Sequence, residues 1–563
     1  MSPSVLSSQT VHTGFTAQNS KGTDMPLSPS AHVDTFCRDN LPPESSWPEF
    51  QFELPSLQYP ERLNCAAVLL DDMVAIVGSD KPCLLSPSSV WTYGELLARS
   101  NQVARVLTED LGLEPGQRVL LRGPNNPWLV ACWFAVVKAG GVVVTTMPML
   151  RAPEITKIVD ITSPSIMLCD HRFAAELTAV ETTATTLVYG SDTGQDLTVR
   201  SAGKATDFAN VDTAADDVVL LAPTSGTTGV PKATMHFHRD VLANADTFSE
   251  HVLKPTRDDV FTGTPPLAFT FGLGGLVVFP LRVGATTLLV ERATPTELAE
   301  LVRDHSVTVL FTAPTAYRAI MAAGAESDLA SLRRGVSAGE HLPVAVWQQF
   351  HERTGLKLID GIGATEMLHV FISAADDDIR PGATGRAVPG FVARIQDSEG
   401  NPVLPGTAGL LAVKGPTGCR YLADERQGKY VRDGWNITGD TFVCDADGYF
   451  WYQARSDDMI VSSGYNIAAP EVEFAVDQHP SVAESAVIGI PDEARGMIVH
   501  AAIVLKPGMI GDAMLIEDIQ RFVKSIAAPY KYPRSIEFRD SLPRTDSGKL
   551  QRFRLHENDR ASA

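Results

Sequence analysis

A run of small hydroxyl residues and glycines within residues 221–239, LAPTSGTTGVPKATMHFHR, has the composition of an anion-binding loop. Its centre consists of Thr224, Ser225, Gly226, Thr227, Thr228 and Gly229. Such a run makes a poor helix interior, but it exposes backbone N–H groups and hydroxyls around an anion, with Lys232 beside it. The spacing differs from a Walker loop, G-x-x-x-x-G-K-[ST], because Val230 and Pro231 separate Gly229 from Lys232. These residues favour a phosphate site and leave an ordinary surface turn as the alternative.

Other residues suited to phosphate and metal chemistry lie downstream. The stretch 360–371, DGIGATEMLHVF, offers a hydroxyl for phosphate at Thr365 and a hard oxygen ligand for Mg²⁺ at Glu366. Near the C-terminus, Lys549 stands in the Ser/Gly turn PRTDSGK. Taken singly, each has an ordinary explanation. A glutamate after a glycine turn complements a helix N-terminus, and a lysine in a turn is usually just solvated.

The motif TSGTTGVPK resembles the phosphate loop of the adenylate-forming superfamily, which includes acyl-CoA synthetases, carrier-protein adenylation domains and luciferases. Further motifs agree with this family in order: SAGE at 337–340, DGIGATE at 360–366, DGWNITGD at 433–440 and PRTDSGK at 543–549. The resemblance extends from about residue 31 to the C-terminus. Within the family, residues 30–50 and the text TEMLH are similar to 2-aminobenzoate- and benzoate-CoA ligases.

The resemblance implies a nucleotide site in which each group has a role. Its members are Thr224, Ser225, Gly226, Thr227, Thr228, Gly229, Lys232, Ala338, Gly339, Glu340, Asp360, Gly361, Asp440, Tyr452 and Arg455. The backbone of 337–340 would lie against adenine, and Tyr452 would pack on the same base. Asp440 would hold both ribose hydroxyls. Arg455 would meet ribose and phosphate, because a planar cation binds oxygens bidentately.

The resemblance also implies the two half-reactions. An ionised carboxylic acid attacks ATP without a general base, so catalysis rests on positioning and positive charge from Mg²⁺ on Glu366, from Thr365 and from Lys549, the expected adenylation lysine. A thiol must then reach the acyl carbon. The small C-terminal domain would rotate about Asp457 for this step, and Ser463 and Gly464 would line a pantetheine tunnel, where a larger side chain would fill the channel.

A third set of residues is expected to form the acyl pocket. It consists of Thr270, Phe271, Gly272, Gly339, Gly363 and His369. Phe271 would be a wall, while Thr270 and Gly272 would fill little space and so suit a flat ring. His369 would supply one polar group for a ring substituent, such as an ortho amino or hydroxyl group. Core packing for the run PPLAFTFGLG, and a core histidine bonded to backbone, are the alternatives.

Strand and helix patterns alternate along most of the chain. We expect helices at 92–107, 127–138, 470–478 and 516–525, and strands at 118–121, 140–144, 166–169, 218–221, 307–311, 484–488 and 500–505. A helix holding Arg333 and Arg334 is expected before SAGE. Alternating βα units predict an α/β fold with a mainly parallel sheet. The expected parts are a disordered tail (1–30), an N-terminal domain (31–456) with a β-rich subdomain at 382–447, and a small mobile α+β domain (457–563).

The composition limits the kinds of partner and the cellular compartment that we expect for this protein. The net charge of −20 argues against nucleic acid or an anionic membrane as the main partner. No apolar run is long enough to span a membrane, and the start of the chain lacks the features of a secretory signal. Seven scattered cysteines without C-x-x-C spacing favour reduced thiols in a cytoplasm and no cysteine metal site.

Three functions compete. The first is an aryl-acid:CoA ligase that uses ATP, Mg²⁺ and coenzyme A, on benzoate, 2-aminobenzoate, salicylate or a related acid. The second is a stand-alone adenylating enzyme that loads a carrier protein's phosphopantetheine. The third is a non-catalytic nucleotide-binding relative, which the presence of Lys549, Glu366, Asp440 and Arg455 disfavours. A homodimer is an open alternative to a monomer.

Replacing Lys549 with Ala should slow aryl-adenylate formation by about 10²-fold or more, the scale of one electrostatic contact in a transition state. Thioester formation from a supplied aryl-adenylate should be largely spared, because the lysine serves the first half-reaction. Single-turnover rates of both half-reactions check this division. Equal losses in the two steps would contradict it.

Overall fold

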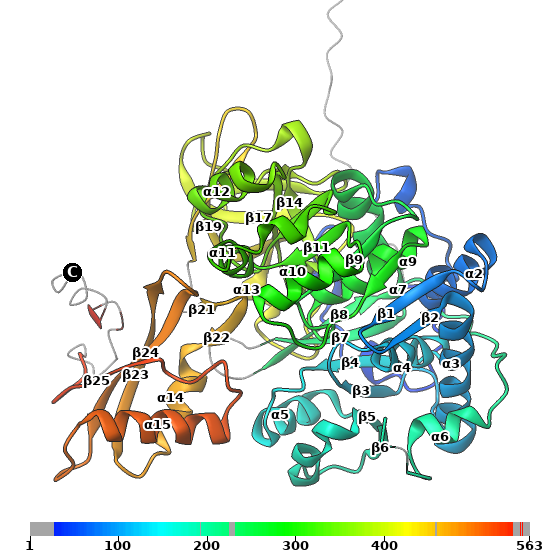
Figure 1. Cartoon of the computed structure of the whole chain (residues 1–563), viewed down its shortest axis with the longest axis horizontal. Coiled ribbons are helices and arrows are strands. Elements are labelled where there is room, and N and C mark those ends of the chain that lie inside the picture. The colour runs from blue at the N-terminus through cyan, green and yellow to red at the C-terminus, as the bar shows by residue number, and fades with distance from the viewer. Residues whose placement is uncertain are drawn as a thin grey trace, which may run out of the picture.

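The structure, a computed structural model, describes residues 27–191, 193–224, 231–455, 459–543, 552, 554 and 555. Figure 1 shows a large α/β body, a β-rich part beside it and a smaller C-terminal part at one end. The α/β class and the mainly parallel sheets predicted from the sequence are confirmed. Most of the predicted tail, the proposed hinge residue Asp457 and residues 544–549 of the motif that holds Lys549 lie outside the described residues.

The first sheet has six strands in the order β6-β5-β3-β4-β7-β8. Their bounds are β3 (Arg118–Arg122), β4 (Val142–Thr146), β5 (Ile166–Asp170), β6 (Thr185–Tyr189), β7 (Val218–Thr224) and β8 (Lys232–Phe237). Neighbours pair in parallel except β8, which runs antiparallel to β7. Strands β3, β4 and β5 are buried along their whole length, and each has a run of apolar residues, as expected for strands covered on both faces.

Helices cover this sheet, two of them at the positions predicted from the sequence. The main ones are α3 (Tyr93–Arg105), α4 (Pro127–Lys138) and α5 (Ala152–Thr162). Helix α3 begins with a capping box, in which Thr92 Oγ1 accepts from the Glu95 N–H and the Glu95 carboxylate accepts from the Thr92 N–H. Helix α4 begins with proline after Asn126, whose side chain accepts from the Leu129 N–H. The predicted helices at 92–107 and 127–138 are confirmed.

The second sheet has nine strands in the order β15-β14-β13-β12-β11-β9-β10-β1-β2. Their bounds are β1 (Pro82–Ser86), β2 (Ser89–Thr92), β9 (Val260–Gly263), β10 (Thr286–Leu288), β11 (Val309–Thr312), β12 (Arg334–Ser337), β13 (Leu358–Gly363), β14 (Val370–Ser373) and β15 (Arg386–Ala387). The six strands from β1 to β13 in this order are parallel, and the outer pairs are antiparallel.

The prediction of a helix that holds Arg333 and Arg334 is wrong, because Arg334 begins strand β12. Arg333 lies directly before this buried strand and Arg334 is its first residue. Both arginines pair with carboxylates. Arg333 Nε donates to Asp259 Oδ1 at 2.6 Å, and Arg334 Nη1 pairs with Asp376 Oδ1 at 2.5 Å. Helices that accompany this sheet are α10 (Pro295–Asp304), α11 (Pro314–Ala322) and α12 (Val344–Thr354).

The predicted β-rich subdomain is a third, antiparallel sheet in the order β16-β17-β19-β18, with β20 paired to β19. Its strands are β16 (Val392–Gln396), β17 (Ala408–Lys414), β18 (Val431–Arg432), β19 (Trp435–Cys444) and β20 (Phe450–Arg455). Short helices elsewhere are α1 (Phe36–Asp39), α2 (Asp72–Val77), α6 (Leu197–Ala202), α7 (His238–Asn244), α8 (Thr270–Leu273), α9 (Phe279–Val283) and α13 (Gln427–Tyr430).

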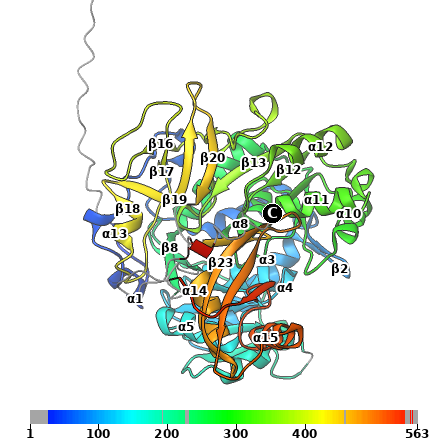
Figure 2. The same ribbon diagram turned by 90° about the vertical axis from the view of Figure 1, so that its left-hand side faces the viewer.

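The C-terminal part has its own core and two small sheets, which face the viewer in Figure 2. It contains the hairpin β21 (Met459–Ser462) and β22 (Tyr465–Ala468), strands β23 (Val482–Asp492), β24 (Gly496–Leu505) and β25 (Ser535–Phe538), and helices α14 (Ala469–Asp477) and α15 (Ala513–Ile526). The predicted helices and strands are confirmed here, although both strands β23 and β24 begin earlier than expected.

The segment 30–50 packs on the body. The Ala31 N–H donates to Asp217 Oδ2 at 3.0 Å, and the Trp47 ring lies 6.1 Å from the Phe237 ring. All seven cysteines are free thiols, in line with the prediction of reduced cysteines. Among the described residues, no helix combines the length and apolarity needed to cross a bilayer.

Candidate active site

Several of the expected site residues stand at the carboxyl ends of parallel strands in two sheets. Thr224 ends β7, residues 264–272 follow β9, residues 338–340 follow β12 and residues 364–366 follow β13. Parallel strands present their carboxyl ends at the same edge of a sheet, which is where open α/β sheets bind ligands. The topology therefore gathers segments that are far apart in the sequence.

An ion pair between Lys232 and Glu366 connects two of the predicted motifs. Lys232 Nζ lies 2.9 Å from Glu366 Oε1, and both side chains are largely buried. Tyr421 joins them, because its hydroxyl donates to Glu366 Oε1 at 2.5 Å and accepts from Lys232. Burial raises the pKa of Glu366, but the charge of Lys232 and the hydrogen bond from Tyr421 outweigh it and hold the pKa below its usual value. The carboxylate is thus ionised.

The two ends of the predicted phosphate loop are fixed by strand pairing. Thr224 and Lys232 are opposite residues of the β7–β8 hairpin, while Ser225, Gly226, Thr227, Thr228 and Gly229 lie outside the described residues. Thr224 Oγ1 is buried without a hydrogen-bond partner among the described residues. Nearby, His236 Nε2 donates to the Thr365 carbonyl at 2.8 Å and so links β8 to the turn that carries Glu366.

The turn 338–340 meets both the β-rich subdomain and the C-terminal hairpin. Gly339 has φ +86°, and a Cβ added there would lie 3.6 Å from Gly464 Cα. Tyr452 stacks on His341 with ring centroids 5.0 Å apart. Asp440 is buried on β19, opposite Arg455 on β20; the Arg455 side chain lies outside the described residues. The expected adenine and ribose groups are therefore near one another in the fold.

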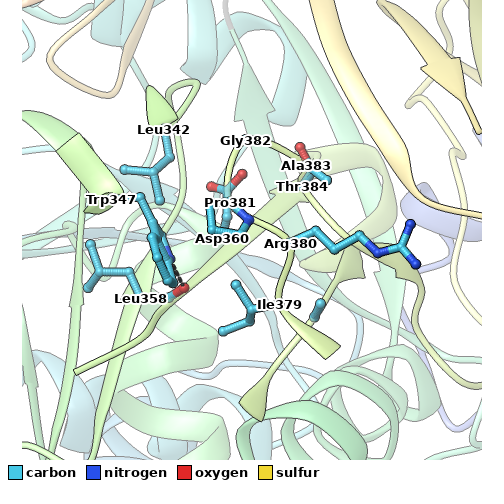
Figure 3. A pocket seen from close by; sticks show the side chains of 11 residues that line it. Leu342, Trp347, Leu358, Asp360, Ile379, Arg380, Pro381, Gly382, Ala383 and Thr384 are labelled. Carbon is cyan, nitrogen blue, oxygen red and sulfur yellow. Dashed lines mark hydrogen bonds between the residues drawn. The ribbon is translucent and has the colours of Figure 1, made fainter. Parts of the chain in front are cut away.

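Asp360 and Gly361 lie on β13, and Asp360 lines a small cavity (Figure 3). In the figure the carboxylate faces the loop 380–384, and Trp347 donates from Nε1 to the Leu358 carbonyl at 2.9 Å. Burial raises the pKa of Asp360 to about 8, although the Gly361 N–H and the Thr384 hydroxyl oppose the rise. A carboxyl with this pKa can donate as well as accept a hydrogen bond near neutral pH.

The predicted acyl pocket centres on His369, which is 3% exposed and surrounded by rings. Its ring centroid lies 4.6 Å from Phe279, 5.4 Å from Phe248, 5.5 Å from Phe271 and 6.4 Å from Phe311. Neither imidazole nitrogen has a hydrogen-bond partner of normal geometry among the described residues. Burial lowers the pKa of His369 to about 3, and the nearby Phe271 backbone opposes only part of that fall. His369 is neutral at physiological pH.

Three glycines shape this cluster in different ways. A Cβ at Gly274 would lie 2.8 Å from His369 Nε2, and one at Gly363 would lie 2.7 Å from the His369 carbonyl oxygen. Gly272 instead faces backbone, since a Cβ there would lie 2.7 Å from the Pro265 carbonyl oxygen. The small size of Gly272 therefore serves close backbone packing. Thr270, the first residue of α8, is buried beside it.

Comparison with known proteins defines the family. The AMP-binding enzyme model matches residues 72–421, and the model of the AMP-binding enzyme C-terminal domain matches residues 471–549. The chain belongs to the AMP-binding enzyme family. The second match ends at Lys549 and so includes the motif at 543–549 that was expected to hold the adenylation lysine. ATP and coenzyme A are accordingly its substrates, and the reaction is that of an AMP-forming acid–CoA ligase.

Among its relatives is a benzoate–CoA ligase of Thauera aromatica, 34% identical, with 89% of this chain and 97% of that protein covered. A 3-hydroxybenzoate–CoA ligase of an Aromatoleum species is 31% identical, with 88% and 97% covered. Among solved structures, the anthranilate CoA ligase AuaEII in complex with anthranoyl-AMP matches with a TM-score of 0.70 and 33% identity, covering 90% of this chain and 99% of that one.

Several residues of this site escape sequence reasoning. Tyr421 lies between β17 and β18 in the segment GPTGCRYLA, which has no periodic pattern. It reaches Glu366 because residues 420–422 hydrogen-bond to β8. Phe248, Phe279 and Phe311 come from three separate segments, so their meeting at His369 depends on the tertiary fold. The sequence did contain a signal for Gly274: with Gly272 it forms a G-x-G pattern, although this pattern does not fit a dinucleotide-binding loop.

Lys232→Met should lower the stability of the protein by about 3–5 kcal/mol, because it leaves the Glu366 carboxylate buried without its cation. The double variant Lys232→Met/Glu366→Gln should regain much of that loss. Urea unfolding midpoints measure both. The control is Lys357→Met, which removes the cation from the exposed pair with Asp377 and should cost far less. Equal losses for the two single variants would contradict a buried ion pair.

Proposed function

We propose that this protein is an aryl-acid:CoA ligase that converts an aromatic carboxylic acid to its adenylate and then to its CoA thioester. His369 supports this most directly. It is a neutral, buried histidine whose nitrogens have no hydrogen-bond partner in the described part of the chain, and it is set among four phenylalanines. Such a site offers ring faces to a flat substrate and one polar group to a substituent. The relatives named above act on benzoate, 3-hydroxybenzoate and anthranilate.

The chemistry divides into two substitutions. In the first, a carboxylate oxygen of the acid attacks the α-phosphorus of ATP, the bond to the β-phosphate breaks and pyrophosphate leaves. In the second, the thiol sulfur of coenzyme A attacks the acyl carbon, the bond to the phosphate oxygen breaks and AMP leaves, while the thiol proton passes to solvent. The chain contributes position and charge, since the acid is already ionised.

Mg²⁺ fits this site through Glu366. The ion prefers oxygen ligands and usually takes one or two protein carboxylates together with substrate phosphates and water. Glu366 is ionised, and the hydroxyl of Thr224 at the end of β7 has no hydrogen-bond partner among the described residues. No group of three or more His, Cys, Asp or Glu side chains in the described ranges could hold a metal alone. When bound, Mg²⁺ would supply positive charge to the phosphates.

Further roles in this proposal rest on the sequence motifs. Lys549 would be the adenylation lysine, Asp457 the hinge between domains 31–456 and 457–563, and Arg455 a ribose and phosphate ligand. Ser463 and Gly464 would line the pantetheine tunnel. Asp440 would hold the ribose, a role compatible with its buried place on β19.

A panel of acids scored by pyrophosphate release tests the function. Benzoate, 2-aminobenzoate and salicylate should be turned over, and the CoA thioester should be the product found by mass spectrometry. Addition of a carrier protein in place of coenzyme A should give little acylation. Faster turnover of octanoate than of any benzoate would end the aryl-acid proposal, and carrier acylation exceeding thioester formation would favour the adenylating alternative.

His369→Ala should flatten the preference between 2-substituted and plain benzoates without abolishing turnover. A buried polar partner left unpaired is worth about 1–3 kcal/mol, which sets the scale of the change in relative kcat/KM. In the unsubstituted protein this preference should be constant between about pH 6 and 8, because a histidine with a pKa near 3 does not gain a proton in that range.

The matched control is His479→Ala, which removes a buried histidine from the C-terminal part and should leave the preference unchanged. An unchanged ratio in His369→Ala would return His369 to a purely structural role. An inflection of the preference near pH 6.5 would show that the ring titrates and would contradict its burial.

A further inference from the structure

The tip of the β21–β22 hairpin reaches the turn that follows β12. The hairpin pairs Ser462 with Tyr465, which leaves a loop of two residues, Ser463 and Gly464. Their φ angles are +50° and +80°, as in a type I′ turn, which matches the twist of a tight hairpin. Arg495 steadies the tip, because its carbonyl accepts from the Ser463 N–H and its Nη1 donates to Ser463 Oγ. Figure 1 shows β21 and β22 where the C-terminal part meets the body.

The contact at the tip is made by the side chain of Glu340. The Gly464 N–H donates to Glu340 Oε1 at 2.6 Å, a short bond of the kind that carboxylates make. The same carboxylate lies against the start of α11, where the N–H and hydroxyl of Thr315 and the charge of Arg318 also act on it. Glu340 therefore bridges a helix N-terminus of the body and the turn of the C-terminal hairpin.

The side chain of Glu340 makes a contact that differs from the one expected for its motif. The motif was predicted to present backbone to adenine, whereas the carboxylate points to Gly464. Gly464 has no side chain to anchor it, and its positive φ disfavours any replacement. Its backbone N–H is thus the group by which the tip can be held, and Glu340 supplies the acceptor.

We infer that Glu340 is a positioning residue for thioester formation: its carboxylate holds the Gly464 turn at the site while coenzyme A delivers its thiol. This inference rests on the proposed function, in which Gly464 lines the path of the pantetheine arm. The alternatives are that Glu340 serves the nucleotide during adenylation, or that it is one of several interchangeable docking contacts.

A second contact between the same parts lies away from the turn and provides a matched control. Lys531 is buried and pairs with Glu154 Oε1 of α5 at 2.5 Å and with Glu471 Oε2 of α14 at 2.9 Å. Glu154→Gln removes an ion of this docking face without touching the Gly464 turn.

The experiment compares Glu340→Ala, Glu340→Gln and Glu154→Gln in single-turnover assays of the two half-reactions. Aryl-adenylate formation is followed by pyrophosphate release, and thioester formation starts from supplied aryl-adenylate at several CoA concentrations. Glu340→Ala should slow the second step by about ten-fold or more, the scale of a hydrogen bond lost with its donor left unpaired, and the first step much less. Glu340→Gln keeps an oxygen acceptor for Gly464 and should recover most of the rate.

Three outcomes would overturn the inference. Equal losses in both half-reactions for Glu340→Ala would assign the side chain to the nucleotide. A Gln variant as slow as the Ala variant would show that acceptance from Gly464 is not what matters. The same loss in Glu154→Gln would reduce Glu340 to general docking. Failure of the unsubstituted protein to release pyrophosphate with any aromatic acid would instead contradict the proposed function.

Discussion

The contact between Lys232 and Glu366 is the interaction on which the site depends. Lys232 begins β8 of the six-stranded sheet, and Glu366 follows β13 of the nine-stranded sheet, so one buried ion pair joins the two sheets at their ligand-binding edges. The whole chain carries a net charge of −20, and positive charge for phosphates must therefore be local. Tyr421 donates to the carboxylate and accepts from the lysine, which satisfies both ions away from water.

The two ends of the site differ in polarity, as the two ends of an aromatic acid do. Around Glu366 the groups are charged or hydroxylic, whereas around His369 they are aromatic rings. Burial disfavours the charged form of the ionisable group at each end. At Glu366 this effect is outweighed by the charge of Lys232, whereas at His369 it keeps the imidazole neutral. The ionised carboxylate of an aromatic acid is thereby directed to the end around Glu366, and its ring to the end around His369.

Local sequence predicted most of the expected helices and strands correctly, but it could not predict which of their side chains come into contact. The capping box at Thr92 and Glu95 and the proline at the start of α4 are local signals, and those helices were predicted correctly. Strand β12 was missed, because Arg334 is stabilised there by Asp376, a residue distant in the sequence. Tyr421 was missed for the same reason. Motif resemblance named Glu340 but could not reveal that its carboxylate faces Gly464, which depends on how two parts of the chain pack.

The most direct test of the central claim is a crystal structure with a hydrolysis-resistant aryl-adenylate analogue carrying a 2-aminobenzoyl group. The account predicts that the ring lies against Phe271 with its amino group at His369, and that the adenosine lies against the backbone of residues 338–340. A second, apolar cavity is lined by Trp133, Leu267 and Leu273. A ring bound in that cavity, away from His369, would contradict the account.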